Sequence, residues 1–108
     1  IGKARATQMM MLGERIGADQ AADWGLIYRA VEDAQLMDEA LALANRLAAG
    51  PTVALAAMRR NIMTALDGSF DQTLRAEAEG QRAAGNSQDA REGAKSFIEK
   101  RKPAFTGA

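Results

Sequence analysis

Apolar positions recur along most of the chain with the 3.6-residue period of an amphipathic α-helix. Gly, Pro, Ser and Asp residues interrupt this period at the places where helices usually begin or end. The helices predicted in this way cover residues 2–12, 18–24, about 34–49, from Pro51 to Asp67, from Ser69 to the AGN of 84–86, and from Ser87 to Arg101 before Pro103.

The signals at the helix ends are local and specific. Gly13 and Gly25 follow apolar runs at the position where a left-handed glycine commonly ends a helix. Asp33 is expected to be the N-cap of the third helix. Ser69 and Gln72 have the spacing of a capping box, which predicts that the fifth helix begins directly after Ser69.

The segment between the second and third helices has a different character. Trp24 is expected to anchor the short second helix by burying a large aromatic surface. Tyr28 to Val31 is aromatic and β-branched enough to predict a short strand, although no partner strand can be found in the chain.

The composition limits the chemistry of the chain. It has 108 residues, which suits one domain over residues 1–108, and its 14 basic and 14 acidic residues give no net charge. No affinity for nucleic acid or anionic membranes is therefore expected. The absence of His and Cys excludes the common hydrolase triads and the usual zinc ligands, and no metal site is expected. With no apolar run of membrane-spanning length, we expect a soluble, cytoplasmic protein.

Two polar residues border the apolar face of the fifth helix. Glu77 and Gln81 are four residues apart and thus lie on the same side of the helix. They could form a pocket wall or a subunit contact, but an ordinary solvated boundary is the favoured interpretation.

The last helix combines a charge gradient with an aromatic residue. Asp89 and Glu92 lie early in it and the basic run 100–102 lies late, an order that complements the helix dipole and by itself explains the charges. Phe97 and Lys100 are nonetheless neighbours three residues apart. A ring beside an ammonium group suits a ligand in which a flat ring is joined to phosphates, as in a nucleotide.

Three segments together resemble a known family. They are GKARATQMMMLGERIGADQAADWGLI, RLAAGPTVALAAMR and DAREGAKSFIEKRKPAFTG, and they cover essentially the whole chain in order. The chain resembles the C-terminal part of a crotonase-superfamily protein of the enoyl-CoA hydratase/isomerase family. Its tail is most similar to the branch that includes the 1,2-epoxyphenylacetyl-CoA isomerases of phenylacetate breakdown.

This resemblance implies an all-α fold of about five to six helices. In the family, an N-terminal spiral of ββα repeats precedes a helical trimerisation region, and only the second part is matched here. Two backbone N–H groups of the spiral hold the thioester oxygen and stabilise an enolate, while acidic side chains of the spiral move protons or activate water. No catalytic residue is therefore assigned to this chain, and it is expected to be inactive by itself.

The resemblance also implies a ligand and an assembly. Phe97 and Lys100 match the family positions that reach the adenine and phosphate end of CoA, commonly a CoA held mainly by a neighbouring subunit. CoA would enter as part of the acyl-CoA substrate, with no prosthetic group, and the complete protein would be a homo-oligomer, a trimer or a dimer of trimers. The alternative is a stand-alone helical self-association module that has neither ligand nor catalysis.

Overall fold

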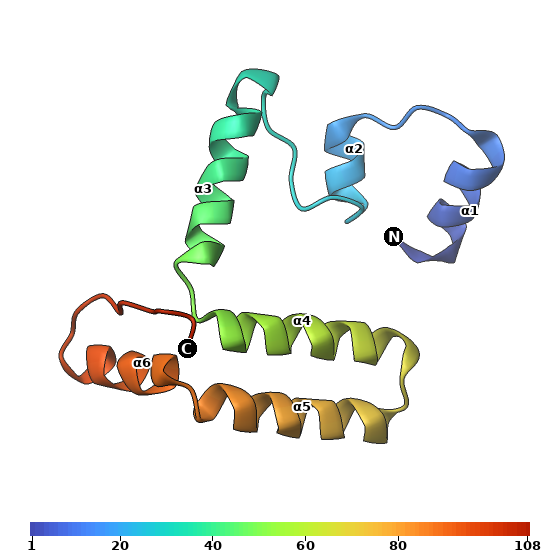
Figure 1. The fold of residues 1–108 in the computed structure, drawn as a ribbon. Coiled ribbons are helices and arrows are strands. Elements are labelled where there is room, and N and C mark those ends of the chain that lie inside the picture. The colour runs from blue at the N-terminus through green and yellow to red at the C-terminus, as the bar shows by residue number, and fades with distance from the viewer. The chain divides into compact units, whose positions relative to one another are not determined.

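The computed structural model describes residues 1–108 and contains six α-helices and no strand (Figure 1). The predicted all-α fold is therefore confirmed. The helices are α1 (Gly2–Leu12), α2 (Ala18–Asp23), α3 (Leu36–Ala48), α4 (Thr52–Asp67), α5 (Phe70–Gly85) and α6 (Gln88–Ile98). They are distributed over two compact units, Ile1–Ala40 and Leu41–Ala108, with the boundary inside α3.

In the first unit, glycines end the helices as predicted. Gly13 adopts a left-handed conformation with φ 63°, and its N–H donates to the Met9 carbonyl at 3.2 Å. Gly25 is also left-handed, with φ 73°. Trp24 is half-buried, and the guanidinium of Arg5 lies 5.3 Å from the centre of its ring. This cation–π contact joins α1 to α2.

Two predictions for the segment before α3 were wrong. Residues 28–31 form no strand, because the chain has no second strand that could pair with their backbone groups. Arg29 of this segment instead forms an ion pair with Glu39. Asp33 is not an N-cap: a 3-10 turn over Asp33–Gln35 precedes α3, and Glu32, at its cap position, makes no side-chain hydrogen bond to the backbone.

In the second unit, α4 and α5 form a hairpin and lie side by side in opposite directions (Figure 1). The predicted capping box begins α5, with Ser69 Oγ accepting from Gln72 N–H at 3.3 Å and Gln72 Oε1 accepting from Ser69 N–H at 2.8 Å. Gly80 of α5 is buried against Ala57 of α4, so close that a Cβ on Gly80 would lie 3.2 Å from the Ala57 Cβ. Small residues thus allow the two helices to approach.

The end of the chain folds back along α6 (Figure 1). Ser87 caps α6 as predicted, since its Oγ accepts from Ala90 N–H at 3.1 Å. Residues 102–108, here called the C-terminal strap, return past α6, and a Cβ on Gly107 would lie 2.5 Å from Thr52 Oγ1 at the beginning of α4. The strap therefore connects the last helix to the start of the hairpin.

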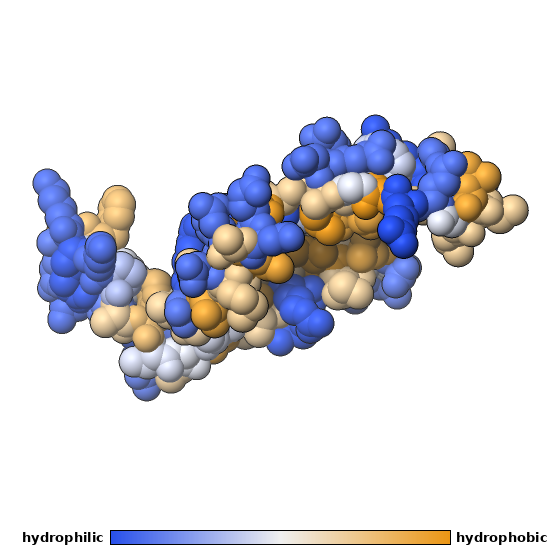
Figure 2. Space-filling view, turned by 90° about the horizontal axis from the view of Figure 1, so that it is seen from above, coloured by the Kyte–Doolittle hydropathy of each residue, from blue (hydrophilic) through white to orange (hydrophobic).

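Few apolar side chains are buried within the chain. Only Ala21 and Ala57 are buried apolar residues, and hydrophobic residues remain at the surface (Figure 2). Those that are more than three-quarters exposed are Met10, Met11, Tyr28, Phe70, Phe97 and Ile98.

No single helix is long and apolar enough to cross a membrane. Residues 33–48 and α4 reach the required length and hydropathy only as a pair broken by a sharp bend.

Candidate functional site

The two residues expected from the sequence to contact CoA lie at the end of α6, Phe97 in its last turn and Lys100 just after it. Phe97 is 84% exposed, and Lys100 is exposed three residues later. The helix ends at Ile98, so the prediction that it continues to Arg101 was wrong. It ends early because Lys100 N–H donates to the Phe97 carbonyl at 3.2 Å and Arg101 N–H donates to the Ser96 carbonyl at 3.0 Å. These two bonds form a Schellman motif.

Lys100 occupies the left-handed position of this motif, which is usually glycine. Its φ is 51°, and no other non-glycine residue of the chain has a positive φ. The left-handed conformation costs an L-residue about 1 kcal/mol or more, because Cβ approaches the following carbonyl oxygen. Such a conformation persists where the surroundings hold it.

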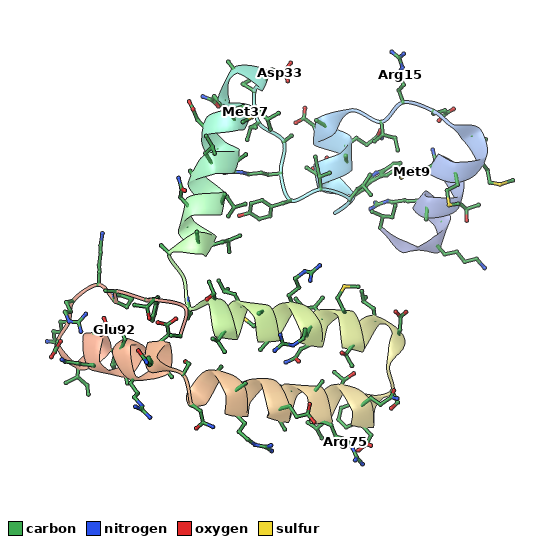
Figure 3. The ribbon with its side chains drawn as sticks, in the orientation of Figure 1. Met9, Arg15, Asp33, Met37, Arg75 and Glu92 are labelled. Atoms are coloured by element: carbon green, nitrogen blue, oxygen red, sulfur yellow. The ribbon has the colours of Figure 1, made fainter.

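Arg101 connects the turn to α6. Its Nη1 and Nη2 donate to the two carboxylate oxygens of Glu92 at 2.5 and 2.9 Å, and its Nε donates to Glu99 at 2.6 Å. Glu92 Oε1 also accepts from Ala104 N–H at 2.8 Å. Glu92 lies on the side of α6 that faces the strap (Figure 3). A bidentate guanidinium–carboxylate pair fixes direction as well as charge.

The charges of this pair stabilise each other. The hydrogen bond from Arg101, followed by that from the Ala104 N–H, lowers the pKa of Glu92 to about 2. The hydrogen bonds to Glu92 and Glu99 raise the pKa of Arg101 above its already high ordinary value. Both partners are therefore charged at neutral pH.

A second carboxylate holds the strap. Asp89 is only 2% exposed, and its two carboxylate oxygens accept from Thr106 N–H at 2.7 Å and Gly107 N–H at 2.9 Å. Its own N–H donates to the Ala108 carbonyl at 3.1 Å. From the sequence, Asp89 was expected only to complement the helix dipole, and nothing in the sequence spacing indicates partners 17 and 18 residues away.

Three hollows of the second unit, one beside α6 and two between α4 and α5, do not include Phe97 or Lys100. The first, about 390 Å³, lies between α6 and the strap, and its wall includes Arg91, Glu92 and Lys95. The second, about 180 Å³, lies between α4 and α5. Glu77 and Gln81 are exposed and border this second hollow, so the solvated boundary favoured from the sequence is also a groove wall.

The whole chain, residues 1–108, matches the family model described as enoyl-CoA hydratase/isomerase. The chain belongs to the enoyl-CoA hydratase/isomerase family. It is 42% identical over 106 residues to 1,2-epoxyphenylacetyl-CoA isomerase of Escherichia coli K12, covering 98% of this chain and 40% of that protein. It is also 42% identical over 107 residues to a protein named as an enoyl-CoA hydratase in Rhodobacter capsulatus, covering 99% of this chain and 42% of the relative.

The fold of this family member agrees with solved structures of the family. A crystal structure of an enoyl-CoA hydratase/isomerase from Mycobacterium abscessus matches all of this chain with a TM-score of 0.95 at 35% identity, over 42% of that protein. The helices thus correspond to the helical region of the crotonase fold, as the resemblance predicted. The chain spans about two-fifths of the length of the relatives that it matches.

Proposed function

We propose that this chain is the CoA-covering and oligomer-forming part of an enzyme that isomerises or hydrates an acyl-CoA thioester. The names of the two relatives support the substrate class, since each contains a CoA thioester. The finer similarity to an epoxyphenylacetyl-CoA isomerase favours a substrate from phenylacetate breakdown. In our proposal the residues that contact the acyl group lie outside this chain.

The observation that carries the proposal is the exposed pair at the end of α6. Phe97 is 84% exposed although phenylalanine is usually buried, and the ammonium of Lys100 has no ion-pair partner. An adenine can stack on the ring, and a phosphate oxygen can accept from the ammonium. Phe97 and Lys100 therefore present the two kinds of contact that the nucleotide end of CoA requires.

The chemical step belongs to other residues of the complete enzyme. Enolate chemistry needs N–H donors that point at the thioester oxygen and an acid or base near the reacting carbon. In our proposal both are supplied by the part of the enzyme outside these 108 residues. CoA is part of the substrate, and the chemistry needs no prosthetic group.

The contact can be tested in the complete enzyme with the double variant Phe97→Ala/Lys100→Ala. Loss of one stacking surface and one charge-assisted hydrogen bond should raise the Kd for CoA roughly 10- to 100-fold and leave kcat nearly unchanged. Calorimetric titration with CoA and steady-state kinetics measure the two effects.

The matched control is Phe70→Ala/Arg75→Ala, which removes an exposed ring and an exposed cation from α5. It should leave the affinity for CoA unchanged. If the Phe97/Lys100 variant binds CoA as tightly as the parent, the proposed contact does not exist.

The purified 108-residue chain should not hydrate or isomerise any enoyl-CoA, and measurable turnover by it would place catalytic groups within the chain.

The exposed apolar faces favour a second candidate, a helical module that only associates with copies of itself. Ile62 and Leu66 of α4 and Leu74 of α5 are each more than half exposed and would suit such a contact. A CoA-binding measurement separates the two candidates, because a module that only self-associates should not bind CoA.

A further inference from the structure

The basic run Lys100–Lys102 offers three cations to a phosphate group, and Arg101 is the one of the three that is paired with carboxylates. We propose that Arg101 binds no phosphate and is instead a positioning residue: through Glu92 and Glu99 it holds the left-handed turn that directs the Lys100 ammonium. This inference rests on the proposed function of Phe97 and Lys100.

The hydrogen-bond capacity of Arg101 is almost fully used inside the chain. A guanidinium has five N–H groups. One, on Nε, donates to Glu99 at 2.6 Å, and Nη1 donates both to Glu92 Oε1 at 2.5 Å and to the Lys102 carbonyl at 3.1 Å. Nη2 donates to Glu92 Oε2 at 2.9 Å, which leaves a single free N–H. A bidentate phosphate contact therefore has no place on this guanidinium.

The two carboxylates also oppose an anion at this position. Glu92 and Glu99 both lie within hydrogen-bond distance of Arg101, so a phosphate that approached it would meet two negative charges. Lys100, by contrast, has no carboxylate partner. Lys100 and Lys102 are thus the two cations of the run that remain available to a ligand, and Lys100 is the one three residues from Phe97.

The geometry shows how Arg101 acts on this neighbour. Its backbone N–H is bonded to the Ser96 carbonyl, and its side chain is bonded to Glu92, one turn further back on α6. Arg101 is therefore attached to α6 through both its backbone and its side chain. These two attachments restrain Lys100 to its φ of 51°. Glu92 extends the same connection to the strap through the Ala104 N–H at 2.8 Å.

Without this connection the turn should relax. The left-handed conformation is unfavourable by about 1 kcal/mol or more for lysine, so a Lys100 that is not held would spend most of its time in other conformations. Its ammonium would then no longer be held in one direction. Binding of CoA would have to restore the turn. The affinity for CoA would therefore be reduced in proportion to the fraction of molecules in which the turn is formed.

A double-mutant cycle in the complete enzyme tests the inference, with Lys100→Ala, Arg101→Gln and the double variant titrated calorimetrically with CoA. Lys100→Ala should raise Kd about 10-fold and Arg101→Gln several-fold, the expected sizes of a lost charge-assisted bond and of a lost preorganised turn. The double variant should bind like Lys100→Ala alone, since Arg101 acts only through Lys100. Losses that add in the double variant would show that Arg101 meets the ligand directly and would overturn the inference.

Glu92→Gln gives a second test in which the two roles predict opposite signs. It removes a negative charge and frees Arg101, so a phosphate-binding Arg101 would bind CoA more tightly. A positioning Arg101 loses its bidentate partner, and the Kd should rise several-fold, with Lys100 Cα and Cβ chemical shifts moving away from left-handed values. Tighter binding would overturn the inference even if Arg101→Gln were to loosen the fold.

The matched control for charge is Arg91→Gln on α6, an exposed arginine with no side-chain hydrogen bond or ion pair. It removes the same charge as Arg101→Gln and should change Kd by less than about two-fold, because exposed charges are screened by salt.

The double-mutant cycle of Lys100 and Arg101 also separates the two proposals. An unchanged Kd for CoA in Lys100→Ala refutes the CoA contact itself. A raised Kd in Lys100→Ala together with an unchanged Kd in Arg101→Gln refutes only the positioning role.

Discussion

At the end of α6, one lysine combines a free positive charge with a backbone conformation that its side chain disfavours. The pair Phe97 and Lys100 was found from spacing and from the family resemblance, and the structure places both at the surface. The φ of 51° at Lys100 could not be predicted, because a lysine at this position gives no left-handed signal. The sequence thus indicates which charged group the residue offers to a ligand. Its backbone conformation is set by the hydrogen bonds to the carbonyls of Phe97 and Ser96.

Lys100→Gly should therefore separate stability from binding. Glycine adopts the left-handed conformation without the Cβ contact, so the free energy of unfolding should rise by roughly 0.5–1 kcal/mol. The affinity of the complete enzyme for CoA should fall, because the ammonium is lost. Chemical denaturation and CoA titration measure the two changes.

Lys102→Gly is the control for this experiment, since Lys102 has no positive φ. It should give no gain in stability. A Lys100→Gly variant that is less stable than the parent would show that the left-handed turn is not populated in solution.

At the scale of elements, the features that the sequence predicted are those made by nearby residues. The capping box of Ser69 and Gln72 and the cap at Ser87 each join residues three apart, so their spacing can be read directly. The strap could not be foreseen in this way. Asp89 holds Thr106 and Gly107 across 17 and 18 residues, and only the folded chain brings them together.

Asp89→Ala should release the strap. It leaves the N–H groups of Thr106 and Gly107 without their charged acceptor, at a cost of about 2–4 kcal/mol in the free energy of unfolding. Hydrogen exchange at these two amides should accelerate strongly, as measured by NMR.

The control substitution is Asp71→Ala, which removes another acidic residue from the first turn of a helix but leaves only an exposed pair with Arg75 broken. It should cost less than about 1 kcal/mol. Unchanged exchange at Thr106 in Asp89→Ala would mean that the carboxylate does not hold the strap.

On the scale of the whole molecule, many more apolar residues are exposed than are buried. Ala21 and Ala57 are its buried apolar residues, whereas Ile62 and Leu66 on α4 are 64% and 70% exposed. Exposed apolar area of this kind promotes association, because burial of each Å² is worth about 25 cal/mol. This surface supports the proposal that the chain normally packs against other protein.

The purified chain should therefore self-associate. Light scattering should give a mass well above the 11.5 kDa of one chain, and Ile62→Glu/Leu66→Glu should lower it. Arg59→Glu, a charge change at another exposed position of α4, should leave the mass unchanged. A stable monomer at concentrations of tens of micromolar would contradict the expectation.

The sequence alone determined the helical character of the chain, most helix ends and the family, because periodicity, caps and motifs are local properties of the residue order. It did not determine the fate of residues 28–31, since a strand depends on a partner that local sequence cannot supply. Nor did it determine the early end of α6 or the roles of Arg101 and Asp89. These depend on hydrogen bonds between residues that only the return of the chain along α6 brings within reach.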